Sequence, residues 1–341
     1  MPSNSAAWLN EPKANPLQVS SAPYTKPGKD EILVENKALA INPVDHKIQE
    51  LGNNLFPWMT YPNIGGTDVA GEVAETGSDI TNFNRGDRVL GFAQGLTNRN
   101  NSEGAFQQYT ILKKNMITPI PDSMSFETAS VLPLAVGTAA TAMFQKDYLA
   151  MDYPTVPQEK PTGKTVLIWA GSTSVGSSAI QLAVAAGYEV ITTASPKNFD
   201  YVKKLGAGHA FDYSSKDIVQ ELLDVCKGKT MAGAVAIADR SVELCAEILS
   251  KSEGNRFVAM VSRGPEKLPD NVQSKFVFGS TLKDNEVGGI IFEEFLPEAL
   301  ARGQFVATPE PLVVGKGLES IQLGYNTLAK GVSAKKIVIT L

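Results

Sequence analysis

The alternation of apolar and polar residues predicts secondary structure most clearly in the middle of the chain. Residues 166–169 form a short apolar run typical of a buried strand. Residues 170–176 hold glycines among small polar residues, which predicts a tight turn. Residues 177–186 carry apolar side chains at helical spacing, and residues 190–194 form a second apolar run. A strand, a turn, a helix and another strand in this order have the length of a βαβ unit.

The turn in this unit indicates a ligand. The first main-chain N–H groups of a helix have no partner inside the helix. Where a strand and a glycine-containing turn lead into a helix, these groups and the helix dipole converge on one point, a geometry that suits a pyrophosphate. We therefore expect residues 165–176 to bind a dinucleotide.

The alternation of strands and helices continues towards the C-terminus. Further strands are predicted at residues 209–213, 233–238, 256–261, 275–279 and 335–341. Helices are predicted at residues 199–205, 217–226, 241–249 and 290–300, the last of these being the last long helix of the chain. This alternation predicts an α/β fold with a mostly parallel sheet covered by helices on both faces.

The residues before the βαβ unit follow a different pattern. Residues 31–41 predict a strand, and short strands punctuated by glycine follow, ending with one at residues 105–112. Together they predict a small all-β domain. Ser125 is a suitable N-cap for a helix, and residues 135–144 continue as a buried, alanine-rich helix.

The composition of the chain excludes several kinds of binding partner and of cellular location. The chain has 341 residues, 43% of them hydrophobic and 20% charged, with a net charge of −5. The acidic balance argues against a nucleic-acid or anionic-membrane partner. No apolar run is long enough for a transmembrane helix, and residues 1–8 lack the features of a secretory signal, so we expect a cytoplasmic protein. Cys226 and Cys245 are expected to be buried thiols in a reducing compartment.

Three stretches resemble the medium-chain dehydrogenase/reductases. They are the spaced glycines and Gly-Asp-Arg-Val signature at residues 71–89, the Gly-Ala-Phe-Gln-Gln-Tyr strand at residues 104–109, and the turn at residues 165–176. The resemblance implies a GroES-like β-rich catalytic domain and a Rossmann domain with a doubly wound parallel sheet. The implied boundaries are residues 1–136, with 285–341 returning to them, for the catalytic domain, and residues 137–284 for the dinucleotide-binding domain.

Zinc alcohol dehydrogenases of this family have ligands that this chain lacks. They place a cysteine where the chain has residues 42–45, and Gly-His-Glu where it has residues 65–68. The loop at residues 94–104 has none of the four cysteines of their structural zinc lobe. His46 and His209 are too few and too scattered to form a site, so we expect no metal.

The zinc-free quinone and enoyl reductases are a better match. Residues 42–47, 132–138 and 195–198 resemble the fungal trans-acting enoyl reductases that partner polyketide synthases. The resemblance implies reduction of an activated C=C bond in a hydrophobic enone or enoyl substrate, either free or carrier-bound. The alternatives are a quinone or aldehyde reductase on the same scaffold, and a non-catalytic NADPH-binding protein. Both a monomer and a homodimer remain open, since residues 276–278 could form a sheet edge that pairs with a second copy.

The end of the second strand of the βαβ unit predicts the cofactor. NAD-specific Rossmann domains place Asp or Glu there to bind the ribose 2′-hydroxyl. This chain has Ser195 and Lys197, a hydroxyl and an ammonium that favour a 2′-phosphate, and Asp200 lies in the following helix. We expect NADPH; the alternative is that Lys197 is only a solvated lysine.

The resemblance also implies a set of site residues. Expected cofactor contacts are Pro43, Val44, Asp45, His46, Thr138, Ser172, Thr173, Ser174, Val175, Ser195, Pro196, Lys197, Asn198, Tyr213, Val261, Ser262, Leu282, Val332 and Ser333. The expected substrate wall, which is apolar, is Val131, Leu132, Pro133, Leu134, Val136, Phe278 and Gly279. No catalytic residue is assigned.

Several of these positions have alternative interpretations. Asp45 either orders its own loop or holds the ribose, and Lys47 is either near the site or exposed to solvent. The Thr138 hydroxyl either faces the nicotinamide or bonds to its own helix backbone. Ser174 replaces a glycine of the family, which the turn permits only if its φ angle is negative. For the remaining positions the alternative is ordinary packing.

Overall fold

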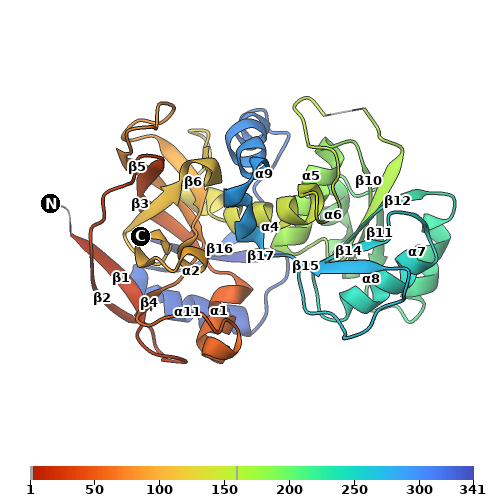
Figure 1. Cartoon of the computed structure of the whole chain (residues 1–341), viewed down its shortest axis with the longest axis horizontal. Helices are drawn as coiled ribbons and strands as arrows, with labels where there is room; N and C mark the ends of the chain where they lie inside the picture. The colour runs from red at the N-terminus through yellow and green to blue at the C-terminus, as the bar shows by residue number, and fades with distance from the viewer. Residues whose placement is uncertain (1–2, 159) are drawn as a thin grey trace. The chain divides into compact units, whose positions relative to one another are not determined.

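The strands of the chain fall into two units, which the computed structural model describes for residues 3–158 and 160–341 (Figure 1). One unit comprises residues 1–134 together with 300–341, and the other comprises residues 135–299. The first contains mostly antiparallel pairs, and every strand pair of the second is parallel.

The second unit is built on a seven-stranded sheet. Its strands are β9 (Lys164–Ile168), β10 (Glu189–Ala194), β11 (His209–Asp212), β12 (Thr230–Ala236), β13 (Glu253–Gly254), β14 (Phe257–Met260) and β15 (Gln273–Phe276). The spatial order is β11-β10-β9-β12-β14-β15, with the short β13 paired to β12. Counted from β9 and leaving out β13, this is the order 3-2-1-4-5-6 of a Rossmann domain, which confirms the predicted doubly wound parallel sheet.

Helices cover both faces of this sheet. They include α5 (Ser174–Ala185), α6 (Phe199–Lys204), α7 (Ile218–Cys226) and α8 (Ser241–Ser250). The second unit also contains α9 (Glu286–Gly289), the π-helix η6 (Ile290–Phe295) and most of α4 (Pro133–Phe144) and α10 (Leu296–Ala301). In Figure 1, α5 and α6 lie on one side of the sheet and α7 and α8 on the other, as right-handed crossovers in both directions from β9 require. Leu167, Ile191 and Val258 from the strands pack with Leu222 and Leu249 from α7 and α8 in the apolar core.

The first unit is the β-rich part of the chain. Its larger sheet contains β3 (Glu31–Ala40), β5 (Asp68–Thr76), β6 (Arg88–Phe92), β7 (Tyr109–Lys113), β8 (Ile117–Pro119), β16 (Glu310–Lys316) and β17 (Lys335–Thr340). The order is β16-β17-β3-β5-β6-β8, and β7 also pairs with β3. A smaller sheet has the order β2-β1-β4, formed by β1 (Asn4–Leu9), β2 (Gln18–Ala22) and β4 (Asn63–Ile64).

Short helices complete both units. The α-helices of the first unit are α1 (Pro43–Leu51), α2 (Gly95–Asn98), α3 (Phe126–Ala129) and α11 (Ile321–Ala329). The 3₁₀ turns are η1 (Gly52–Asn54), η2 (Asn101–Glu103), η3 (Lys114–Met116), η4 (Pro196–Asn198), η5 (Gly279–Asp284) and η7 (Leu318–Ser320). Among residues 3–158 and 160–341, no helix is both long and apolar enough to cross a membrane.

Some expected elements are wrong in extent. The strand expected at residues 105–112 begins only at Tyr109, and the one expected at 275–279 already ends at Phe276. β16 and α11 were not expected, so the helix near residue 295 is not the last. β16 is a mostly exposed edge strand with a proline and a glycine, which removes the alternation that predicts strands. Cys226 and Cys245 are both buried free thiols, as expected.

Candidate cofactor and substrate site

The turn between β9 and α5 is closed by Thr173. This residue is the N-cap of α5, and its hydroxyl oxygen accepts the N–H of Gly176 at 3.1 Å. The same hydroxyl donates to the main-chain oxygen of Ala170 at 2.8 Å. One side chain therefore joins the end of the turn to the start of the helix. The first N–H groups of α5 have no partner inside the helix, and such groups are what binds anions at helix N-termini.

Close approach explains the two glycines of the turn. A Cβ at Gly171 would lie 2.2 Å from Oγ1 of Thr192, and one at Gly176 would lie 2.3 Å from the main-chain oxygen of Ala170. Ser174 is the first residue of α5 and has helical backbone, so the condition for replacing the family glycine is met. The left-handed residue of the turn is Ala170, with φ of 64°. The shape of the turn fits the cradle of a dinucleotide pyrophosphate.

The end of β10 presents the residues expected to select the cofactor. Ser195 follows the strand directly, and its hydroxyl accepts a hydrogen bond from Nδ2 of Asn198 at 3.1 Å. Lys197 is exposed, within the 3₁₀ turn η4. Asp200 is an exposed residue of α6, as expected. These groups fit a dinucleotide that carries a 2′-phosphate.

Other expected cofactor residues follow neighbouring strands. Tyr213 comes directly after β11 and is 52% exposed. Val261 and Ser262 follow β14, and the Ser262 hydroxyl donates to the main-chain oxygen of Ala238 at 2.8 Å. Because the strands are parallel, all these residues lie at the carboxyl ends of the strands, on the same side of the sheet as the glycine turn. Rossmann domains bind their ligands on this side.

In the first unit, Asp45 orders the start of α1. Its carboxylate accepts the main-chain N–H of Asn42 at 2.7 Å, three residues earlier, and only 2% of the residue is exposed. Pro43 and Val44 form the first turn of the same helix, with His46 partly exposed and Lys47 fully exposed beyond them. Asp45 therefore orders its own loop, and a contact of Asp45 with the ribose stays a prediction.

Burial also changes the ionisation of Asp45. Loss of solvent raises the pKa of its carboxyl to about 7, against the opposing effect of the Asn42 and Gly66 N–H groups. Asp45 borders a cavity of about 10 Å³ that Phe106 and Tyr325 also line. Burial and the Asp45 charge raise the pKa of the Tyr325 hydroxyl as well. A cavity of this size holds about one water molecule.

Four buried side chains meet at residues 42–45 and 65–68, the segments in which the resemblance places zinc ligands, and at β17. Asn42, Thr67, Asp68 and Lys336 form what we call the buried polar cluster. Nδ2 of Asn42 donates to Oδ2 of Asp68 at 2.7 Å and to Oγ1 of Thr67 at 3.0 Å. Nζ of Lys336 lies 2.9 Å from Oδ2 of Asp68 and also donates to Oδ1 of Asn42. The four side chains thus bind one another.

The donor chemistry of this cluster does not fit zinc. Zinc sites in proteins use thiolate, imidazole and carboxylate ligands. Here an amide and a hydroxyl stand beside one carboxylate, and a lysine ammonium already neutralises that carboxylate. Within the described residues, no group of three or more His, Cys, Asp or Glu side chains is placed to hold a metal ion.

The expected substrate wall continues into helix α4. Val131, Leu132 and Val136 are fully buried, and Pro133 and Leu134 begin the helix. The N–H of Leu134 donates to Oδ1 of Asp68 at 2.6 Å, so the buried polar cluster also holds the start of α4.

Thr138 and Gly279 lie against each other in the second unit. A Cβ at Gly279 would lie 2.9 Å from Oγ1 of Thr138. The main-chain oxygen of Gly279 accepts the Thr141 hydroxyl at 3.2 Å. The structure thus brings one expected cofactor residue and one expected wall residue into contact.

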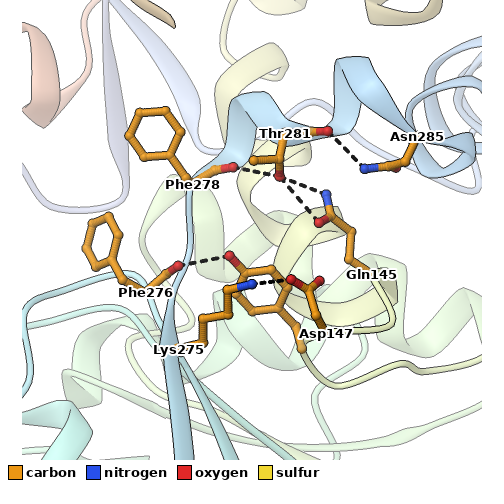
Figure 2. A network of polar contacts seen from close by, with 8 residues as sticks. Gln145, Asp147, Lys275, Phe276, Phe278, Thr281 and Asn285 are labelled. Carbon is orange, nitrogen blue, oxygen red and sulfur yellow. Dashed lines mark hydrogen bonds and ion pairs between the residues drawn. The ribbon is translucent and has the colours of Figure 1, made fainter. Parts of the chain in front are cut away.

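A polar network fixes the segment that carries Phe278, Gly279 and Leu282 (Figure 2). Oγ1 of Thr281 donates to the main-chain oxygen of Phe278 at 3.0 Å and accepts from Nε2 of Gln145 at 2.9 Å. Figure 2 shows the rings of Phe276 and Phe278 on the same side of this segment, turned away from the network. Leu282 is fully buried within η5.

The buried polar cluster also connects the tail to α1. Val332 and Ser333 are exposed residues shortly before β17, the strand that carries Lys336. Sequence analysis did not identify Lys336. The feature of the sequence that could have identified it is the pair Lys335–Lys336 at the start of an apolar strand. Consecutive side chains of a strand point to opposite faces, so one lysine of the pair points inwards.

The two units match known protein families. Residues 28–122 match the family model "Alcohol dehydrogenase GroES-like domain", and residues 174–298 match the model "Zinc-binding dehydrogenase". Despite the name of the second model, the Asn42 amide, the Thr67 hydroxyl and the lysine-paired Asp68 carboxylate are not a set of zinc ligands.

Full-length relatives and a solved structure agree with these matches. "Dehydrogenase pigH" of Monascus ruber is 47% identical over an alignment of 369 positions, which covers 100% of both chains. "Trans-enoyl reductase himH" of Aspergillus japonicus is 39% identical, covering 99% of this chain and 97% of the relative. The crystal structure of an alcohol dehydrogenase superfamily protein from Novosphingobium aromaticivorans matches with a TM-score of 0.80 at 26% identity, covering 99% of each chain. A GroES-like part and a Rossmann sheet, matched along the whole chain, identify this protein as an oxidoreductase of the medium-chain dehydrogenase/reductase superfamily, whose fold implies a nicotinamide cofactor.

Proposed function

We propose that this protein is an NADPH-dependent reductase that reduces the activated C=C bond of an enone or enoyl substrate without zinc. The observation that carries the proposal is the buried polar cluster. In the segments where the resemblance places zinc ligands, the Asn42 amide binds the Thr67 hydroxyl and the Asp68 carboxylate, and Lys336 pairs with that carboxylate. Carbonyl reduction in the zinc enzymes relies on a Lewis acid, whereas a conjugated C=C bond needs only hydrogen-bond donors at the carbonyl oxygen.

The end of β10 supports NADPH. A carboxylate at this position would repel a 2′-phosphate, and the chain has the Ser195 hydroxyl and the exposed Lys197 ammonium there. In this proposal Ser172, Thr173, Ser174 and Val175 hold the pyrophosphate. Under the same proposal the second unit, residues 135–299, binds the dinucleotide, and the first unit, residues 1–134 with 300–341, is the catalytic domain.

When bound, the cofactor supplies a hydride to the β-carbon of the substrate. The C=C π bond breaks, a C–H bond forms at the β-carbon, and the electron pair moves through the α-carbon to the carbonyl oxygen. A proton from solvent then forms the second C–H bond at the α-carbon, so one NADPH and one proton are consumed for each double bond. The role of the protein is to hold the β-carbon in position for the hydride.

The apolar wall supports a hydrophobic substrate. Val131, Leu132 and Val136 are fully buried and present no surface. Leu134 and Phe278 are apolar and partly exposed, so a substrate can contact them. A hydrophobic acyl chain, free or carrier-bound, suits such a surface. The similarity to a protein named trans-enoyl reductase supports the same class of substrate.

Two alternatives have a clear test. A quinone or aldehyde reductase would use the same cofactor, and a non-catalytic protein would bind NADPH without turnover. The purified protein is mixed with NADPH and with a panel of enones, enoyl thioesters, quinones and aldehydes, and oxidation is followed by the loss of NADPH absorbance. Turnover with enones or enoyl thioesters supports the proposal, and turnover confined to quinones or aldehydes contradicts it. Quenching of the fluorescence of Trp169, which directly follows β9, without turnover on any substrate would favour the binding protein.

A further inference from the structure

Lys336 is a lysine almost fully enclosed in protein. Only 4% of the residue is exposed, and its carboxylate partner, Asp68, is completely buried. Its neighbour Lys335 has the opposite environment, with 41% of its side chain exposed and a surface ion pair to Glu310. Alternation along β17 explains the difference, because consecutive side chains of a strand point to opposite faces.

Each partner of Lys336 belongs to a different segment of the proposed site. Asn42 directly precedes α1, whose first residues are the expected cofactor contacts Pro43–His46. Asp68 opens β5 and accepts the N–H of Leu134, at the start of α4 and within the expected substrate wall. Lys336 itself lies three residues after Ser333, an expected cofactor contact of the tail.

The energetics make a purely stabilising role a weak explanation. Removing an ammonium and a carboxylate from water carries a large desolvation cost for each ion. Apolar residues of similar volume often stabilise a fold as well as such a pair does. Unlike apolar packing, an ammonium forms directional hydrogen bonds. Lys336 can therefore fix the orientation of both of its partners.

We propose that Lys336 is a positioning residue for the site, acting through Asp68 and Asn42. The inference rests on the proposed function. The Lys336 ammonium holds the Asn42 amide by its oxygen, while Nδ2 of the same amide binds Asp68 and Thr67. Through these bonds the position of Asn42, just before α1, depends on Asp68, which binds the start of α4, and on Lys336 of β17. Without the ammonium, the Asn42 amide can rotate and the first turn of α1 can shift.

The first test replaces Lys336 by a side chain of similar length without charge. We expect Lys336→Met to raise the Kd for NADPH, measured by the fluorescence of Trp169, by about tenfold, a typical effect of losing a group that orients direct contacts. The kcat/KM for the enone should fall by about 100-fold, because misplacing reacting groups by about 1 Å has an effect of that order. Lys335→Met makes the same substitution on the exposed face of the strand and should change neither value.

A second variant separates positioning from stability. Lys336→Met alone leaves the buried Asp68 without its cation and should lower the Tm. Combined with Asp68→Asn, which removes the unpaired charge and keeps an oxygen for the Leu134 N–H, it should regain most of that Tm. The Kd for NADPH should remain raised in the double variant, because the ammonium that orients Asn42 is still missing. If Lys336→Met does not fold, the double variant alone decides.

Two results would overturn the inference. One is a Kd for NADPH that returns to the wild-type value together with the Tm in the double variant, which is the behaviour of a structural residue. The other is a Kd for Lys336→Met equal to that of Lys335→Met. Failure of the proposed function looks different, because the wild-type protein would then not bind NADPH or would not reduce enones and enoyl thioesters.

Discussion

The hydroxyl group of Tyr148 donates a hydrogen bond to the main-chain oxygen of Phe276, 2.9 Å away, at the open edge of the parallel sheet. The N–H of Gln273 binds the main-chain oxygen of Arg256, just before β14, and the N–H of Val277 binds that of Met260 at the end of β14. Phe276 alternates with these residues, so its main-chain groups point away from β14. A side chain thus takes the place that a further strand would occupy. Beside it, Lys275 forms an ion pair with Asp147, as Figure 2 shows.

Loss of this hydroxyl should weaken the sheet edge. We expect Tyr148→Phe to lower the free energy of unfolding by about 1 kcal/mol, because a hydrogen bond from a buried group is lost. Lys275→Met is the matched control, since it removes an exposed ion pair at the same edge and should have a smaller effect. Urea unfolding measures both.

The same variant tests how the chain assembles. With the Phe276 oxygen unpartnered, the edge of β15 is open to pairing with a second copy, so Tyr148→Phe should increase the dimeric fraction in analytical ultracentrifugation. An unchanged sedimentation profile at high protein concentration would show that the hydroxyl does not protect this edge.

Exchange of the charge after β10 should lower the preference for NADPH over NADH. In Ser195→Asp with Lys197→Ala, a carboxylate faces the 2′-phosphate and the ammonium is lost. We expect the ratio of kcat/KM for NADPH to that for NADH to fall by about tenfold or more, because a hydrogen bond to a charged group contributes about 1.5–3 kcal/mol. Lys204→Ala removes an equal charge from α6, and its ratio should stay at the wild-type value. An unchanged ratio in the double variant would refute the assignment of NADPH.

The Rossmann half of the fold could be predicted because its determinants are local. Apolar runs define β9 and β10, and the glycines between β9 and α5 exclude larger side chains by close contact. β16 and α11 could not be predicted in the same way. β16 is held by pairing with β17, more than twenty residues further along the chain, and the local pattern carries no trace of that partner.

The candidate site shows the same division between local and long-range determinants. The helical backbone of Ser174 and the cap at Thr173 follow from neighbouring residues. The buried polar cluster joins positions separated by up to 294 residues. In the sequence Lys335 and Lys336 look alike, and only the register of β17 decides which of them is buried.

Asp45 should make the stability of the protein depend on pH. Its pKa is about 7 in the folded state, above the ordinary value of 3.8. The folded state therefore binds more protons than the unfolded state between these values, and the free energy of unfolding falls as the pH rises from about 4 to about 7. A shift of this size corresponds to about 4 kcal/mol at most.

Asp45→Asn should remove this contribution. The amide keeps an oxygen for the Asn42 N–H and has no charge to bury. The difference in unfolding free energy between the variant and the wild type should therefore increase in favour of the variant as the pH is raised from 5 to 8. Asp87→Asn is a close control, because Asp87 accepts the N–H of Asn84 at the same distance of 2.7 Å in an exposed turn. Urea titrations at both pH values make the comparison. Parallel pH profiles for the wild type and Asp45→Asn would contradict the raised pKa.

The N-cap of α5 should affect stability and cofactor affinity together. Thr173→Val keeps the shape of the side chain and removes the hydroxyl that accepts the Gly176 N–H, which should cost about 1 kcal/mol of unfolding free energy. It should also raise the Kd for NADPH, because the turn loses its link to Ala170. Ser125→Ala removes the corresponding hydroxyl from the N-cap of α3 in the other unit, where the side chain accepts the Thr128 N–H at 3.2 Å. This control should lose similar stability at an unchanged Kd. If both variants weaken NADPH binding equally, the effect of Thr173 is general destabilisation, and the turn between β9 and α5 does not hold the cofactor through this cap.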